Sequence, residues 1–191
     1  MLLTIKTRQK YLKALGLYDG QIDGKEGPML KESYKKLQRK YFTREKDKDG
    51  LYGVNTDILL RNAYKVETYT RNFDLDEFKC DCKGKYCTGY PVILNSQLLK
   101  NIQSIRTKFG STTITSGLRC QRYNDSIPGS IKGSYHVKGK AIDFANANTS
   151  TLPSRRIVMS YCRKLPNAGY TYCDENGSHP NMGNAIHTQV K

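Results

Sequence analysis

Apolar residues in the first 66 positions recur three or four residues apart, which is the spacing of one helix face. One such segment runs from Thr7 to a glycine at position 16, and a second begins at Pro28, a residue suited to the first turn of a helix. Thr56 is placed to cap a third helix. The stripes consist of Tyr11, Leu12, Leu15, Leu30, Tyr34, Leu37, Tyr41, Ile58, Leu59 and Ala63. The pattern predicts a small three-helix module over residues 1–66.

The rest of the chain mixes helical and alternating patterns. A helical stripe covers residues 95–109, and another helix is expected after Pro153. β-branched or alternating segments predict strands at 112–116, 141–145, 169–173 and 185–190. Helices that precede and separate strands favour an α+β fold with a central antiparallel sheet.

Residues 67–79 have the character of a linker that leads into this second part. Phe73, Leu75 and Phe78 are spaced to anchor the start of the second domain. The expected organisation is therefore a module at 1–66, a linker at 67–79 and an α+β domain at 80–191.

Two loops of the N-terminal module repeat one turn chemistry. Residues 17–28 contain two Asp-Gly pairs and a Gly-Pro, and residues 49–56 contain another Asp-Gly, so both are expected to be tight turns. The ordered set LYDGQIDG at 17–24, GP at 27–28 and LQ at 37–38 resembles the three-helix peptidoglycan-binding module of bacterial and phage wall hydrolases. The resemblance implies that residues 1–66 bind peptidoglycan; the alternative is a helical packing domain without a ligand.

Charge narrows the choice of partner. Lysine and arginine total 32 against 17 aspartate and glutamate residues, a formal net charge of +15, which favours nucleic acid, an acidic membrane or an anionic cell wall. The excess is spread along the chain without a basic tail, recognition helix or RNA-binding signature, so no dedicated nucleic-acid role is expected. No apolar run approaches the roughly 18 residues that a membrane span needs.

Six cysteines are too few for a disulfide scaffold. Three of them, Cys80, Cys82 and Cys87, form a Cys-x-Cys-x4-Cys cluster, and the others are Cys120, Cys162 and Cys173. The cluster is compatible with a structural zinc site whose fourth ligand lies elsewhere. Disulfides are a second interpretation, and buried reduced thiols that pack as small apolar groups are a third and the preferred one.

Candidate chemistry lies at two histidines and one aspartate. In strands, Asp143 shares a face with two alanines, and His187 shares a face with Ala185 and Gln189. A carboxylate in such a strand is costly to bury unless it is paired or binds a metal. If the strands are neighbours and His136 comes from the preceding loop, the three side chains form a catalytic zinc centre with a position open for water. A His–Asp hydrogen bond in a polar patch is the alternative.

Two motifs of this part resemble a known family. The element SGLRCQRYN at 116–124 is similar to "S-G-x-R-x-x-x-x-N", and SYHVKGKAID at 134–143 is similar to "S-x-H-x-x-G-x-A-x-D", with an Ile-His pair far downstream at 186–187. Together they resemble the zinc D-Ala-D-Ala carboxypeptidase and L-Ala-D-Glu endopeptidase superfamily. The resemblance covers roughly residues 68–191.

The resemblance implies roles for individual residues. The motif positions imply that zinc is bound by His136, Asp143 and His187. The family's arginine, which positions substrate and polarises the scissile carbonyl, corresponds to Arg119, for which a surface salt bridge is the alternative. The motif serine and asparagine correspond to Ser134 and Asn124, and both are expected to contact substrate.

The chain departs from the family at the general base. Many members carry Glu or Asp three residues before the last histidine, but here that residue is Asn184, which cannot take a proton and is grouped with the substrate contacts. A related subgroup has Asp two residues after that histidine, where this chain has Gln189. The loop upstream offers candidate bases in the order His179, Asp174 and Glu175; the alternative is a solvated turn.

The combined pattern favours an endolysin-like peptidoglycan hydrolase, a zinc peptidase of the L-Ala-D-Glu endopeptidase or D-Ala-D-Ala carboxypeptidase type. A non-catalytic wall-binding protein with a degenerate zinc site is the alternative. The first ten residues lack the apolar stretch and cleavage site of a secretory signal. We therefore expect a monomer that is made in the cytoplasm without a signal peptide and reaches the wall after phage or prophage lysis.

Overall fold

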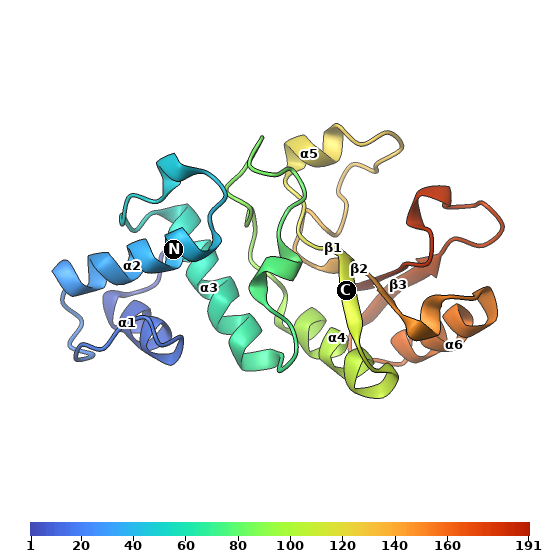
Figure 1. The fold of residues 1–191 in the computed structure, drawn as a ribbon, viewed down its shortest axis with the longest axis horizontal. Coiled ribbons are helices and arrows are strands. Elements are labelled where there is room, and N and C mark those ends of the chain that lie inside the picture. The colour runs from blue at the N-terminus through green and yellow to red at the C-terminus, as the bar shows by residue number, and fades with distance from the viewer.

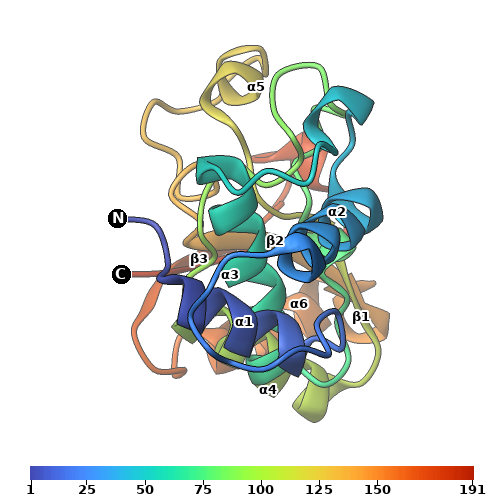
Figure 2. The same ribbon diagram turned by 90° about the vertical axis from the view of Figure 1, so that its left-hand side faces the viewer.

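The computed structural model describes residues 1–191, and its elements fall into two groups (Figure 1). Three helices, α1 (Ile5–Ala14), α2 (Pro28–Tyr41) and α3 (Val54–Tyr69), lie together at one end of the molecule. Figure 2 views this end directly, with α1 and α2 nearest the viewer. A sheet and the remaining helices form the other end, which confirms the predicted α+β class.

Four strands form one antiparallel sheet in the order β1-β2-β4-β3. Their bounds are β1 (Thr112–Ser116), β2 (Ala141–Asn146), β3 (Ala168–Cys173) and β4 (Ile186–Val190). Helices α4 (Ser96–Phe109) and α6 (Leu152–Cys162) pack against one face, where Ile142, Phe144 and Ile186 join the main apolar core. Alternation along the strands directs Asp143 and His187 to the opposite face.

The predicted strands and long helices are confirmed, and the structure adds short elements that periodicity does not reveal. These are α5 (Gln121–Asp125) and the 3-10 turns η1 (Glu45–Asp47), η2 (Leu75–Phe78), η3 (Ala147–Thr149) and η4 (Pro180–Met182). Each is five residues or shorter, so none spans enough turns to show an apolar stripe. None of the helices has both the length and the apolar character needed to cross a membrane.

Two expectations about α3 need correction. Its N-cap is Gly53 rather than Thr56, which lies buried inside the first turns, where its hydroxyl donates to the Leu51 carbonyl at 3.0 Å. The helix continues to Tyr69, so residues 67–69 of the expected linker are helical. Thr56 satisfies its hydroxyl by folding back on the preceding loop, an alternative to capping that is open to threonine.

The helical group packs onto the rest of the chain. Buried Asn62 on α3 donates from Nδ2 to the Val92 carbonyl at 2.9 Å and accepts from the Leu94 N–H at 2.8 Å. One continuous core of 30 buried residues runs from Leu12 to Val190. Expected anchors contribute to it: Phe73, Leu75 and Phe78 are all buried. That residues 1–66 act as a separate binding module stays a prediction.

A buried glutamine holds the first Asp-Gly loop. Gln9 on α1 donates from Nε2 to Asp23 Oδ1 at 2.7 Å, and its Oε1 accepts from the Gly24 N–H at 2.8 Å. The backbone of Gly24 has a φ of 78°, in the left-handed region that favours glycine. The loop is therefore fixed by both ends of one side-chain amide.

The second Asp-Gly loop repeats this arrangement one helix later. Gln38 on α2 donates from Nε2 to Asp49 Oδ1 at 3.2 Å and accepts from the Gly50 N–H at 2.7 Å. Gly50 has a φ of 75°, close to the value at Gly24. The repeated turn chemistry of the sequence thus corresponds to two equivalent glutamine-bound loops.

Replacing Gln38 with alanine is expected to destabilise the protein. The substitution leaves the buried Gly50 N–H without its acceptor, which costs about 1–3 kcal/mol of unfolding free energy. Exposed Gln21→Ala is the control, with an expected change within about 0.5 kcal/mol. Denaturant unfolding measures both, and equal changes in the two variants would contradict the role assigned to Gln38.

Candidate metal centre

The pairing of β2 with β4 sets Asp143 opposite His187 on the sheet face away from α4 and α6. His136 comes from the loop before β2, and the whole residue is only 3% exposed, against 5% for His187. Residues 51 positions apart are thus brought into one buried group. The structure assembles all three predicted ligands; that they bind zinc stays a prediction.

Three potential ligand atoms converge at this point. His136 Nε2 lies 3.3 Å from His187 Nδ1 and 3.4 Å from Asp143 Oδ1, and His187 Nδ1 lies 2.7 Å from the same oxygen. Ligands at about 2.0–2.1 Å from a tetrahedral zinc ion are about 3.3 Å apart. Two of the three separations match that spacing, and the third is shorter.

Hydrogen bonds behind the imidazoles orient them. The Gly117 carbonyl lies 2.8 Å from His136 Nδ1, and Gln189 Oε1 lies 3.2 Å from His187 Nε2. Both oxygens are acceptors, so these ring nitrogens carry the protons and the other two present lone pairs to Asp143. Two nitrogen lone pairs and a carboxylate therefore meet with no hydrogen-bond donor between them, which is an arrangement that a bound cation would stabilise. Two imidazole nitrogens and one carboxylate oxygen are ligand atoms that suit zinc.

The close approach at Gly117 depends on glycine. A Cβ on Gly117 would lie 2.5 Å from the Phe78 carbonyl oxygen, which accepts a hydrogen bond from Leu118 N–H at 2.8 Å. The segment η2 therefore lies directly behind the residue that orients His136.

Electrostatics keep the carboxylate ionised. Burial alone would raise the pKa of Asp143, but before a metal binds either imidazole can take up a second proton, and the protonated ring then donates to the carboxylate and carries a positive charge. These contributions of His136 and His187 outweigh burial and hold the pKa of Asp143 well below its usual range. Asp143 is therefore negatively charged at neutral pH, the form that binds a metal cation.

Arg119 lies beside this centre and is held by neighbouring polar side chains. Its guanidinium donates to Asn124 Oδ1 at 3.4 Å and to Ser116 Oγ at 3.3 Å. Asn124 is buried and donates to the Ile131 carbonyl at 3.2 Å, so the structure places it behind Arg119 rather than on the cavity surface. Ser134, by contrast, is buried at the cavity wall itself.

A cavity of about 560 Å³ opens over the three predicted ligands. Three tyrosines, Tyr135, Tyr170 and Tyr172, line it together with the loops 127–131 and 178–182. The Tyr172 ring stacks on the His187 ring at a centroid distance of 4.6 Å. Burial, with a smaller contribution from the Asp143 charge, raises the pKa of Tyr172, so its phenol remains a hydrogen-bond donor at neutral pH.

The candidate bases separate into two groups. His179 lines the cavity, and its ring contacts the Tyr172 ring at 4.5 Å. Asp174 instead accepts the backbone N–H of His179 at 2.7 Å, and Glu175 forms a salt bridge with Arg156 at 3.2 Å. Neither acid lines the cavity.

Asn184 is also directed elsewhere. Its Oδ1 accepts a hydrogen bond from Arg155 at 3.1 Å, and the residue does not line the cavity.

The sequence motifs predict neither Tyr172 at the site nor the contact that Gln189 makes with His187. Tyr172 pairs with His187 in the sheet register, a proximity that no motif encodes.

Loss of either histidine should remove the metal. In His136→Ala and His187→Ala one of three ligand atoms is missing, so the zinc ion of this centre is expected to be lost on dialysis, and metal analysis should find one zinc ion per chain fewer than in wild type. Gln189→Ala removes only the acceptor behind His187, and we expect affinity to fall about 10- to 100-fold. His179→Ala is the matched control and should keep its zinc. Full occupancy in His136→Ala would refute the ligand assignment.

Comparison with known proteins agrees with this geometry. No curated protein matches the chain. Residues 71–179 match the sequence model of the peptidase M15 family, a range that includes Arg119, His136 and Asp143 and ends eight residues before His187. The match spans more than half of the 191 residues. This chain therefore belongs to the peptidase M15 family, whose members are zinc-dependent metallopeptidases.

Proposed function

We propose that the chain is a peptidoglycan hydrolase, a zinc peptidase that cleaves the stem peptide of the bacterial wall. The observation that carries the proposal is the convergence of His136, Asp143 and His187 at a cavity that Arg119 also lines. Two imidazoles and one carboxylate, with the remaining coordination open to a cavity, are typical of catalytic rather than structural zinc.

Each residue at the cavity has a part in peptide cleavage. Bound to the His136, Asp143 and His187 side chains, zinc supplies Lewis acidity toward water and toward a peptide carbonyl. The two side-chain contacts of Arg119 are to neutral groups, so neither of them offsets the positive charge of its guanidinium. A carbonyl or carboxylate oxygen of the substrate accepts hydrogen bonds from the guanidinium, which orients the peptide.

Proton transfer is assigned to His179. His179 is the third histidine at the cavity, in addition to the two predicted ligands. The loop that carries His179 is held by a hydrogen bond from its backbone N–H to the Asp174 carboxylate. Imidazole accepts and returns protons near neutral pH. His179 therefore takes the role that an acidic residue at position 184 has in many relatives, with Tyr172 as a further donor toward the substrate oxygen.

The wall as substrate is supported by charge and by the N-terminal helices. A net charge of +15 attracts anionic wall polymers, with binding that weakens as salt rises. The two glutamine-bound loops lie in the part of the chain that resembles a peptidoglycan-binding module. Such a module raises the effective concentration of the peptidase at an insoluble substrate without new contacts at the active site.

One observation favours a second candidate, a wall-binding protein without catalysis. Asn184 stands where an acidic residue is expected, and its side chain is bonded to Arg155, away from the cavity. If His179 does not accept the proton, the metal centre has no base and the protein binds wall without cutting it.

Digestion of purified peptidoglycan separates the two candidates. The intact protein is expected to release fragments with new amino termini, identified by mass spectrometry, and the release should stop with a zinc chelator and return with added zinc. His136→Ala is the inactive control. Wall binding without release from several wall types would favour the second candidate, whereas neither binding nor release would refute peptidoglycan as the target.

His179→Ala tests the base directly. Loss of a general base is expected to lower kcat by about 10²- to 10⁴-fold with zinc content unchanged. Asp174→Asn is the control, because its amide oxygen still accepts the His179 N–H and its activity should stay near wild type. Activity lost in Asp174→Asn but kept in His179→Ala would contradict the assignment.

A further inference from the structure

Four cysteines meet at a second place in the fold. Cys80, Cys82 and Cys87 lie in the loop between η2 and α4, and Cys120 follows Arg119 at the start of α5. All four Sγ atoms lie within 4.8 Å of one another. The sequence cluster of three thiols thus receives a fourth from 33 residues further along the chain.

The spacing of these sulfurs suits a metal ion better than disulfides. Cys82 Sγ and Cys87 Sγ are 3.4 Å apart, against about 2.05 Å in a disulfide, and all six cysteines are free thiols. Zinc–sulfur bonds of about 2.3 Å in a tetrahedron place neighbouring sulfurs about 3.7 Å apart. The group has the dimensions of a four-thiolate site.

Backbone donors point at two of the sulfurs. The Cys120 N–H donates to Cys80 Sγ at 3.3 Å, and the Gly89 N–H donates to Cys87 Sγ at 3.4 Å. Donors of this kind stabilise negative charge on sulfur, as the outer hydrogen bonds of metal sites do. These N–H contacts are a separate observation from the short distances between the sulfurs. They favour negatively charged thiolates over neutral thiols that only pack in the interior.

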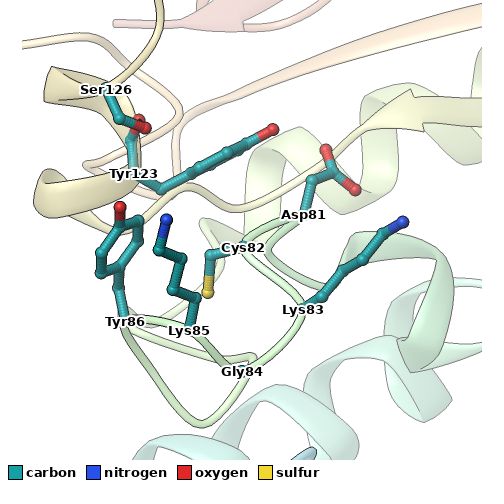
Figure 3. Close-up of a pocket in the computed structure, with 8 residues that line it drawn as sticks. All are labelled: Asp81, Cys82, Lys83, Gly84, Lys85, Tyr86, Tyr123 and Ser126. Atoms are coloured by element: carbon teal, nitrogen blue, oxygen red, sulfur yellow. The ribbon is translucent and has the colours of Figure 1, made fainter.

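The loop that carries three of these thiols has no regular secondary structure. Residues 79–95 form no helix or strand, and the loop turns through left-handed backbone at Lys83, with a φ of 49°, and Gly84, with a φ of 82°. Figure 3 shows this loop, from Asp81 to Tyr86, facing Tyr123 and Ser126 of the α5 region across an open pocket. Cys80, Cys82 and Cys120 form a small buried cluster separate from the main core.

We propose that Cys80, Cys82, Cys87 and Cys120 bind a structural zinc ion. Four thiolates carry more negative charge than one zinc ion neutralises, and nearby basic side chains offset the excess. Lys83 and Lys85 lie on the loop itself, and Arg122 lies over the Tyr86 ring at 5.3 Å. A closed set of four protein ligands leaves no position for water, so this ion has no catalytic part.

The site joins the loop to the residues around Arg119. Cys120 is the N-cap of α5, and its carbonyl accepts the Asn124 N–H at 2.9 Å. Asn124 in turn holds the Arg119 guanidinium. A zinc ion at Cys120 therefore fixes the backbone next to Arg119. This role does not depend on which substrate the enzyme cleaves.

The test is zinc content and coordination in the full-length chain purified under reducing conditions. Wild type is expected to hold about two zinc ions per chain, and a His136→Ala, His187→Ala double variant about one. X-ray absorption of the double variant should show sulfur neighbours alone, at about 2.3 Å. Cys120→Ser should lose one zinc ion, and Cys162→Ser, a buried cysteine outside the cluster, should lose none.

Three results would overturn the proposal: a double variant free of zinc, a coordination shell containing nitrogen or oxygen, or disulfides among the four cysteines on mass spectrometry of alkylated protein. The double variant decides the question even where Cys120→Ser does not fold. Peptidoglycan digestion is measured separately, so an inactive protein with a four-sulfur zinc ion refutes the proposed function and supports this site.

Discussion

The site depends on the register in which the strands of the sheet pair. One row of paired residues crosses all four strands: Ser116 on β1, Asp143 on β2, His187 on β4 and Tyr172 on β3. Because side chains alternate along a strand, a shift of one residue in β2 or β4 would turn a ligand into the apolar core. Ile142, Phe144 and Ile186 oppose that shift, since they would lose their burial against α4 and α6.

Contacts outside the sheet position His136, which does not belong to this row, and connect the N-terminal helices to the site. The Phe78 backbone packs against Gly117, whose carbonyl orients His136, and α3 is bonded through Asn62 to the segment that leads into α4. The N-terminal helices are therefore continuous with the core that supports the metal centre. The helices of residues 1–66 and the sheet that carries Asp143 and His187 therefore share one apolar core.

The two proposed metal sites have different roles, one catalytic and one structural. An incomplete ligand set of two histidines and Asp143 faces a cavity, as catalysis requires, whereas four thiolates at the loop would form a closed set. Arg119 directly precedes Cys120 in the sequence and lines the cavity that also contains His136, Asp143 and His187.

Local patterns along the chain were enough to predict the α+β class, the long helices, the strands and the three candidate ligands, because period-two and period-3.6 spacings and short motifs are local properties. Packing of the folded chain sets the contacts between distant segments: Tyr172 beside His187, Gln189 behind it, Asn124 behind Arg119, and Cys120 as the fourth thiol. It also turned Asn184 and Asp174 away from the cavity and left His179 there. Motifs carry residue type and spacing, whereas the direction of a side chain is set by packing and hydrogen bonds across the fold.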